Sequence, residues 1–322
     1  MLQLTPELLQ RYDVPGPRYT SYPTADRFVQ AFTEQDYIQA LHDRRDGIGW
    51  RAQPLSLYVH LPFCASLCYY CACNKIITKH PERAREYLRW LEMEVALQVR
   101  HLGTGHSVSQ LHLGGGTPTF LSDEELRHLM HVLRSHFNLV PGGEYSIEID
   151  PRTVSAERLQ VLHQLGFNRL SFGVQDFEPA VQKAVHRIQP AKQVFALMKE
   201  ARRLGFTSIN ADLIYGLPFQ TVDSVKNTIE KVKQLRPDRI AFYSYAHVPW
   251  MKPAQRGYSE KDLPEAETKR KIYETGRELL EKSGYKEIGM DHFALKNDAL
   301  FTAVETGNLH RNFMGYTSGK TR

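Results

Sequence analysis

Between residues 55 and 246, the chain alternates short apolar runs with longer segments whose apolar residues recur at helical spacing. The apolar runs are nearly continuous, which predicts strands buried on both faces of a parallel sheet. They span Leu55–Phe63, Val108–Leu113, Tyr145–Ile149, Arg169–Val174, Ser208–Ile214 and Arg239–Tyr245. The amphipathic segments predict helices over Pro81–His101, Asp123–Phe137, Ala156–Leu165, Ala191–Leu204, Val222–Leu235 and Ala266–Ser283.

Local signals mark the ends of several predicted helices. Ser122 with Glu125, and Thr221 with Ser224, follow the pattern of a capping box at a helix N-terminus. Gly205 stands where a C-terminal cap belongs, and an aromatic residue and the next strand follow it. Together the segments form six strand–helix units, which is the alternation of an α/β fold with a parallel sheet.

Periodicity alone does not separate an open doubly wound sheet from a barrel. Polar residues and glycines, however, gather at or just beyond the C-terminal ends of the strands, at Cys64, Gly114–Thr117, Glu148, Gln175 and Asp212. In a barrel those ends converge on one mouth, where active sites lie. We therefore predict a partial (β/α)6 TIM-like barrel over residues 51–283, between an irregular N-terminal segment (1–50) and a region of short segments (284–322).

Composition and charge exclude only a few classes of function. The chain has 322 residues, of which 42% are hydrophobic, so it can bury a full core. No apolar run reaches the ~20 residues of a membrane span, and the N-terminus lacks the design of a secretion signal, so we expect a cytoplasmic protein. The net charge is +5 without a dense basic block, which does not support nucleic-acid binding.

The four cysteines change this picture. Cys64, Cys68, Cys71 and Cys73 all fall within ten residues, where disulfides could close only tiny loops. Such clustering points to metal binding. The C-x3-C-x2-C spacing can hold three irons of a [4Fe–4S] cluster and leaves the fourth iron for an exogenous ligand, which S-adenosylmethionine supplies through its amino and carboxylate groups. A zinc site with Cys73 as the fourth ligand is the alternative.

A run of three glycines, Gly114 to Gly116, closes the second predicted strand and is followed by Thr117 and Pro118. Glycine lets a backbone approach a ligand closely and expose its N–H and C=O groups. The run can therefore bind the methionine end of S-adenosylmethionine as a short backbone edge. Alone it would more often mark a tight corner or a phosphate site, but it follows the cysteine array by one strand–helix unit, which favours the first interpretation.

The cysteine array resembles that of the radical S-adenosylmethionine enzymes. Further segments resemble the oxygen-independent coproporphyrinogen III oxidases in particular, and the similarity covers almost the whole chain. These segments are Arg18–Pro23, His60–Lys75, Glu148–Pro151, Arg169–Phe177, Asp212–Pro218, Gly289–Ala294 and His310–Phe313. A related family of haem chaperones shares the barrel motifs, but it usually has an aromatic residue at the position of Cys73 and lacks the N-terminal Tyr/Arg/Pro segment.

The resemblance implies which residues hold the cofactors. Cys64, Cys68 and Cys71 would ligate a [4Fe–4S] cluster, whereas Cys73 would not. The family's crystallographic picture contains two S-adenosylmethionine molecules, and the matching contact positions are Tyr58, Tyr70, Gly115, Gly116, Thr117, Glu148, Gln175, Arg187, Asp212 and Ala246. Each of these residues could also have a role without cofactor binding. Glu148 and Gln175 would then be ordinary polar residues at the mouth of the barrel, Arg187 a surface arginine and Tyr58 a core residue.

The resemblance also implies a reaction: oxidative decarboxylation of two propionate side chains of coproporphyrinogen III to vinyl groups, giving protoporphyrinogen IX in haem biosynthesis. A flavodoxin or ferredoxin would donate the electron, and the protein would be a monomer. No catalytic residue is assigned beyond the cluster and S-adenosylmethionine. A haem chaperone, and a radical enzyme acting on another substrate, are the alternatives.

The sequence leaves two alternatives open for the N-terminal segment and two for His292. The N-terminal Arg11, Arg18, Tyr19 and Tyr22 would either meet carboxylates of the substrate or tie the segment to the barrel. His292 has either a structural role or a role in the site. Family members continue into a largely helical C-terminal domain, so we expect residues 284–322 to be the start of that domain.

Overall fold

The sheet at the centre of the molecule is made mostly of parallel strands. The computed structural model describes Thr5, Glu7, Leu8, Arg11 and residues 27–47, 53–312 and 314–318. The parallel strands are β1 (Leu55–Leu61), β4 (His106–Gly115), β5 (Phe137–Ile149), β6 (Arg169–Gln175), β7 (Ser208–Tyr215) and β8 (Arg239–Ser244). They lie side by side in chain order, as a singly wound barrel requires, and this confirms the predicted sheet of six units.

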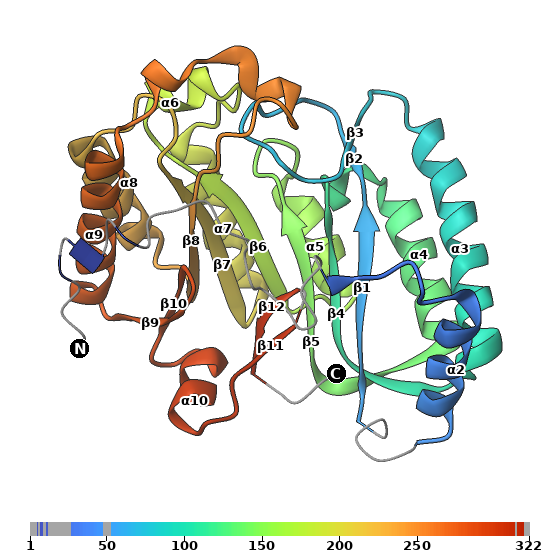
Figure 1. Cartoon of the computed structure of the whole chain (residues 1–322). Coiled ribbons are helices and arrows are strands. Elements are labelled where there is room, and N and C mark those ends of the chain that lie inside the picture. Colours follow the sequence, from blue (N-terminus) through green and yellow to red (C-terminus); the bar gives the residue numbers. More distant parts are fainter. Residues whose placement is uncertain are drawn as a thin grey trace.

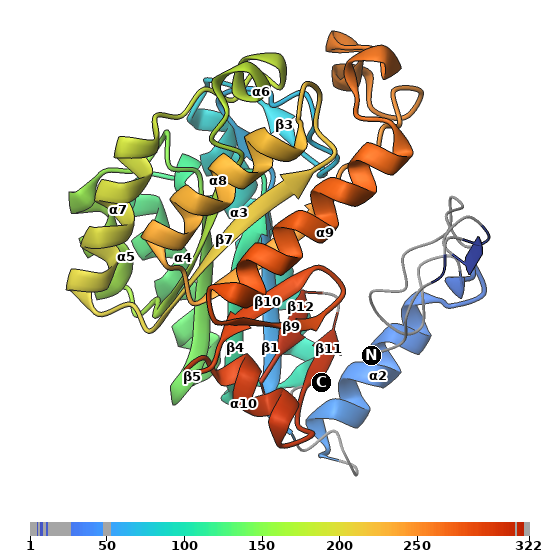
Figure 2. The ribbon, with the colours of Figure 1, turned by 90° about the vertical axis from the view of Figure 1, so that its left-hand side faces the viewer.

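Helices cover the outer face of the curved sheet, and Figures 1 and 2 show them as one outer layer. They are α3 (Glu82–Leu102), α4 (Asp123–His136), α5 (Ala156–Gln164), α7 (Ala191–Leu204), α8 (Val222–Leu235) and α9 (Ala266–Lys282). The short helix α6 (Pro179–Ala184) lies above the sheet in Figure 1, at the C-terminal ends of the strands. The core lies between helices and strands, where Ile147, Phe172 and Phe242 are almost fully buried. All predicted helices begin and end within one residue of their expected bounds. The short helix α6 was not predicted. Both capping boxes are present as predicted.

Strand β5 begins eight residues earlier than predicted. Its first part pairs with β4 through Val108 and Leu139, and the pairing resumes between Gln110 and Glu144. The residues skipped on β5 include Pro141-Gly-Gly, which reads as a turn in the sequence. The insertion is an irregularity inside one strand, so the predicted start of this strand at Tyr145 was wrong.

Several shorter elements were not predicted. A helix, α2 (Glu34–Arg45), lies within the N-terminal segment, where Thr33 caps it. Strands β2 (Phe63–Cys64) and β3 (Ile76–Ile77) flank the cysteine loop. Three 3-10 turns follow, η3 (Pro118–Phe120), η4 (Pro253–Gly257) and η5 (Glu260–Asp262). Arg11 is exposed, and Arg18, Tyr19 and Tyr22 lie outside the described residues.

Residues beyond 283 extend the same sheet. Strand β10 (His292–Leu295) pairs antiparallel with β8, and β9 (Tyr285–Gly289) pairs with β10. A short helix, α10 (Ala299–Glu305), and a hairpin of β11 (His310–Asn312) and β12 (Gly315–Thr317) follow. Strands β1 and β9 form the two edges of the eight-stranded sheet, so it curves without closing, as the partial barrel predicts. Among the described residues, no helix is long and apolar enough to cross a membrane.

Candidate functional site

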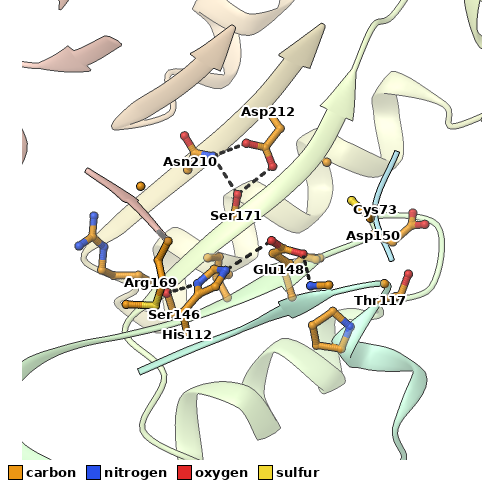
Figure 3. A pocket seen from close by; sticks show the side chains of 18 of the residues that line it. Cys73, His112, Thr117, Ser146, Glu148, Asp150, Arg169, Ser171, Asn210 and Asp212 are labelled. Atoms are coloured by element: carbon orange, nitrogen blue, oxygen red, sulfur yellow. Dashed lines mark hydrogen bonds and ion pairs between the residues drawn. The ribbon is translucent and has the colours of Figure 1, made fainter. Parts of the chain in front are cut away.

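A cavity of about 630 Å3 lies inside the curved sheet. Most of the residues predicted for the site line it, namely Cys64, Cys68, Cys71, Tyr70, Gly115, Gly116, Thr117, Glu148, Gln175, Arg187 and Asp212. These residues come from five strands and the loops after them, which confirms that the polar strand ends converge on one mouth. Figure 3 shows the polar side chains that face this cavity.

Two predicted contact residues do not line the cavity. The Tyr58 ring stacks on His112 with 5.9 Å between ring centroids, and its hydroxyl lies 2.9 Å from Nδ1 of His60. The carbonyl oxygen of Ala246 accepts a hydrogen bond from Nε2 of Gln255 at 3.1 Å. Tyr58 therefore stands one side chain behind the cavity wall, since its neighbour His112 belongs to the lining.

The cysteine loop is fixed at both ends. Strand β2 ends at Cys64, and β3 returns beside it, with Phe63 paired to Ile76 and Cys64 to Ile77. Between these strands, the amide of Cys71 donates to the carbonyl oxygen of Cys68 at 3.1 Å. A short parallel pair of this kind holds the loop against the mouth, so the thiols have a defined position before any ligand binds.

The thiols differ in how readily they lose a proton. Burial raises the pKa of Cys64, although the Thr117 hydroxyl lies 3.4 Å from its sulfur. A hydrogen bond from the Cys73 thiol and the charge of Lys75 lower the pKa of Cys71 to about 6. The pKa of Cys73 is raised in turn by the bond to Cys71. Cys71 is thus the better thiolate ligand of this pair, because iron binds the thiolate form.

The donor set fits an iron–sulfur cluster better than a single metal ion. In the part of the chain that the structure describes, no three His, Cys, Asp or Glu side chains converge on one ion. A cubane cluster places each cysteine on a different iron, so its ligands are spread out, whereas zinc needs four around one centre. Two guanidinium groups also approach the Cys68 sulfur, Arg152 at 3.4 Å and Arg187 at 3.5 Å.

A buried carboxylate positions both arginines. Asp150 accepts from Nη2 of Arg152 at 2.7 Å and from Nη1 of Arg187 at 3.2 Å. Burial alone would raise the pKa of Asp150, but the two guanidinium groups outweigh it and hold this pKa below its ordinary value. Asp150, Arg152 and Arg187 thus form a charged triad, and their mutual hydrogen bonds hold the two guanidinium groups in place next to Cys68.

Arg187 is a buried residue, so its interpretation as a surface arginine is wrong. It is 6% exposed and donates from Nη2 to the carbonyl oxygen of Gly173 at 2.7 Å. Its Nε is buried and has no hydrogen-bond partner among the described residues. An unsatisfied buried N–H costs free energy, so this atom is a ready donor to a bound ligand.

The glycine run is packed so tightly that side chains are excluded. Gly115 has a φ of +113°, and a Cβ there would meet the His60 ring at 2.6 Å. A Cβ on Gly116 would meet backbone atoms of Pro62 at 2.7 Å. The run therefore packs closely against β1 and the start of the cysteine loop, because Pro62 precedes β2, and its approach to a ligand stays a prediction.

The N–H groups of this run are already used within the protein. The Gly115 amide donates to Oε2 of Glu148 at 3.1 Å, the Gly116 amide to a carbonyl oxygen of β1 at 2.8 Å, and the Thr117 amide to that of Phe63 at 2.8 Å. The expectation that these N–H groups face a ligand is therefore wrong. Thr117, which follows the run, lines the cavity.

Two carboxylates on β5 and β7 form the inner layer of the site. Oε1 of Glu148 lies 3.4 Å from Nε2 of His112, whose Nδ1 is 2.6 Å from the Ser146 hydroxyl. On β7, Asp212 accepts from Oγ of Ser171 at 2.9 Å and from Nδ2 of Asn210 at 2.7 Å. Figure 3 shows both carboxylates turned toward the same space.

Burial and the nearby charge of Glu148 raise the pKa of Asp212 to about 6. Burial is the larger cause of this rise, and the negative charge of Glu148 adds to it by disfavouring a second charge on Asp212. Such a site is suited to a ligand that brings hydroxyl donors or a positive charge. These are the groups that a ribose or an ammonium would offer to Glu148 and Asp212.

Sequence reasoning assigned no role to several residues of the lining, chiefly His112, Asp150, Arg152, Ser171 and Asn210. A usable signal was present for some of them. Polar residues stand at alternate positions in Arg169-Leu-Ser171 of β6 and in Asn210-Ala-Asp212 of β7. Alternation of this kind places them on one face of a strand, and a polar face inside an otherwise apolar strand marks a cavity.

The comparisons with known proteins agree with this geometry. Residues 58–232 match the family model of the radical SAM superfamily. The oxygen-independent coproporphyrinogen III oxidase of Pseudomonas aeruginosa is 50% identical over 314 residues, which are 97% of this chain and 67% of the relative. That of Escherichia coli is 48% identical over 311 residues, or 97% of this chain and 66% of the relative.

A solved structure shows the same likeness in three dimensions. Coproporphyrinogen III oxidase (HemN) from Escherichia coli, described as a radical SAM enzyme, superimposes with a TM-score of 0.90 at 45% identity. The match covers 97% of this chain and 69% of that one, so the chain spans about two thirds of the length of these relatives. The chain belongs to the oxygen-independent coproporphyrinogen III oxidase family of the radical SAM superfamily.

Proposed function

We propose that this chain carries out the oxidative decarboxylation of two propionate side chains of coproporphyrinogen III to vinyl groups, giving protoporphyrinogen IX in haem biosynthesis. The observation that carries the proposal is the match to relatives of that name over 97% of the chain at 48–50% identity. The matched span includes the residues of the cavity itself, so the likeness concerns the site as well as the fold.

The cysteine loop and the cavity would hold the cofactors. Cys64, Cys68 and Cys71 would bind a [4Fe–4S] cluster, with S-adenosylmethionine on the open iron. When bound, this pair supplies an electron and a carbon radical able to take a hydrogen atom from the substrate. The relatives' family name supports one S-adenosylmethionine site, and we propose that a second molecule binds in the same cavity.

The chain's own residues would bind and orient these groups. Glu148 and Asp212 accept hydrogen bonds from ribose hydroxyls or from an ammonium group, because a donor between them relieves the repulsion of their charges. The buried Nε of Arg187 donates to a carboxylate or a ribose oxygen. The curved sheet shields the centre from water on its outer face.

An external one-electron donor, such as a flavodoxin or a ferredoxin, would reduce the cluster. The reaction removes a carboxyl group as CO2 together with a hydrogen atom and one further electron from each propionate, so an electron acceptor is also needed. The four carboxylates of the substrate would find cationic partners at the mouth of the cavity.

An anaerobic product assay tests the proposal. The reconstituted chain is incubated with S-adenosylmethionine, a reductant and coproporphyrinogen III, and mass spectrometry follows the loss of two carboxyl groups. The Cys71→Ser variant serves as the control and should form no product. Tight haem binding without any change in the porphyrinogen would contradict the proposal and would favour the haem chaperone alternative.

A further inference from the structure

Three aromatic rings from three different elements form a wall at one end of the cavity. Tyr243 on β8, His292 on β10 and Tyr316 on β12 all belong to its lining. The rings of Tyr243 and His292 meet edge to face at 5.7 Å between centroids, and those of His292 and Tyr316 at 5.2 Å. We call this group the aromatic wall; it is a continuous π surface that residues far apart in sequence build together.

A two-residue turn joins β9 to β10 and places His292. Met290 and Asp291 have φ values of 35° and 71°, the left-handed conformation that a hairpin turn of this length takes at both central positions. The carbonyl oxygen of Asp291 accepts from the amide of Phe242 at 2.7 Å, which fixes the turn to β8.

A glycine completes the wall. Gly289 has a φ of +144°, and a Cβ there would meet the Tyr316 hydroxyl at 2.6 Å. The β9–β10 turn therefore leaves room for the Tyr316 side chain from the β11–β12 hairpin. On its other side, the Arg311 guanidinium lies 4.4 Å from the centroid of the Tyr316 ring.

Tyr243 and His292 of the wall lie toward the opposite end of the strand order from the cysteine loop and the glycine run, which we call the cofactor end. The strand order runs from β1 and β4, which carry the cysteine loop and the glycine run, to β8 and β10, which carry Tyr243 and His292. Between them stand the carboxylates of β5 and β7. A ligand resting on the wall would therefore face the cofactor end across the cavity.

We propose that the aromatic wall receives a pyrrole ring of the tetrapyrrole substrate, so that the propionate on that ring points toward the cofactor end. A pyrrole is flat and rich in π electrons, and its faces pack well against aromatic edges and faces. This inference rests on the proposed function and names the residues that select its substrate.

Equilibrium dialysis under anaerobic conditions tests it with coproporphyrinogen III as the probe. Replacing Tyr316 by Leu should raise the dissociation constant about tenfold, because the ring packing is lost. Tyr316→Phe, which keeps the ring, should stay within about twofold of the unsubstituted chain. Trp90→Leu, which changes an exposed aromatic residue of α3, is the control and should have no effect.

The affinity for S-adenosylmethionine, measured on the same variants, separates the wall from the cofactor site. We expect it to be unchanged in Tyr316→Leu, together with iron content and Tm. Equal loss of both affinities, an unchanged affinity for the porphyrinogen, or no porphyrinogen binding by the unsubstituted chain would each overturn the inference. If the unsubstituted chain binds the porphyrinogen on this wall but forms no product, the proposed function fails and the inference stands.

Discussion

At the scale of single residues, the cavity offers guanidinium groups in one region and carboxylates in another, although Asp150 pairs with the former and Arg169 and Arg239 also belong to the lining. Arg152 and Arg187 approach the cysteine loop at Cys68, whereas Glu148 and Asp212 lie further along the sheet. A ligand that carries both a carboxylate and hydroxyl or ammonium donors would satisfy both regions in one orientation. S-adenosylmethionine has this distribution of groups, which is the physical reason why these residues suit it.

The cysteine assignment gives the first prediction. Anaerobic reconstitution should yield about four irons and four sulfides per chain, the content of one cubane cluster. Replacing Cys64, Cys68 or Cys71 with Ser should abolish the brown absorbance, because each thiolate holds a separate iron. Cys73→Ser should retain the cluster, and loss of iron in that variant would make Cys73 a ligand and contradict the open iron.

The raised pKa of Asp212 gives a prediction for stability against pH. Its pKa is about 6 in the folded chain against an ordinary 3.8, so the folded state binds this proton more tightly than the unfolded state. Stability from this group is therefore present below about pH 4 and is lost as the pH rises through 6. In Asp212→Asn, the free energy of unfolding should exceed that of the unsubstituted chain by about 1–3 kcal/mol at pH 8 and by nothing at pH 4.

Urea unfolding of the chain without cofactors, at pH 4, 6 and 8, measures this difference. Asp223→Asn is a suitable control, since that carboxylate lies on the surface of α8 in an ion pair with Lys226. A gain in Asp212→Asn that does not vary with pH would show that packing, and not titration, is responsible. The same variant should bind S-adenosylmethionine more weakly at pH 8, because a carboxylate acceptor is lost.

At the scale of elements, the helices and the buried strands could be predicted well. Their periodicity is strong, and signals such as the capping box at Ser122 fix the helix ends. What could not be predicted depends on contacts between distant segments. The pairing of β10 with β8, the β11–β12 hairpin and the packing of Arg187 against Asp150 have no local signature. The site was predictable where motif spacing carries the chemistry, as at the cysteines, and not where side chains meet across strands.

The contact between the glycine run and the cysteine loop gives a prediction at this scale. In Gly116→Ala, the new Cβ would meet backbone atoms of Pro62 and Phe63 at 2.7–2.8 Å, and the backbone cannot yield without moving Cys64. We expect the free energy of unfolding to fall by about 1–3 kcal/mol, as for other overpacked sites, and iron binding to fall several-fold. Iron analysis after reconstitution and urea unfolding measure the two effects.

Gly307→Ala is the matched control for this substitution. Gly307 has a φ of +67°, and a Cβ added there would have no neighbouring atom within 4 Å, so alanine strains the backbone without crowding anything. It should lower stability modestly and leave the iron content unchanged. Equal iron loss in both variants would mean that general destabilisation, and not the contact with the cysteine loop, explains the result.

At the scale of the whole molecule, the sheet does not end with the sixth strand–helix unit. Strands β9 and β10 continue it, and the buried Asp298 at the start of α10 connects this region to the sheet. Its carboxylate accepts from Nε of Arg239 on β8 at 2.7 Å and from the Ser208 hydroxyl on β7 at 2.8 Å. Residues 285–305 are therefore held by both backbone pairing and a buried ion pair.

These contacts predict that residues 285–305 unfold together with the six parallel strands. Hydrogen exchange followed by mass spectrometry in increasing urea should show peptides of β9, β10 and α10 opening at the same urea concentration as those of β7 and β8. Asp298→Ala leaves Arg239 buried without its carboxylate, so the global free energy of unfolding should fall by about 3–5 kcal/mol. Glu305→Ala, which removes an exposed partner of Lys286, should cost less than about 1 kcal/mol. Separate, earlier opening of residues 285–305 in the unsubstituted chain would show that they form an independent unit, and the boundary at residue 283 would then separate two folding units.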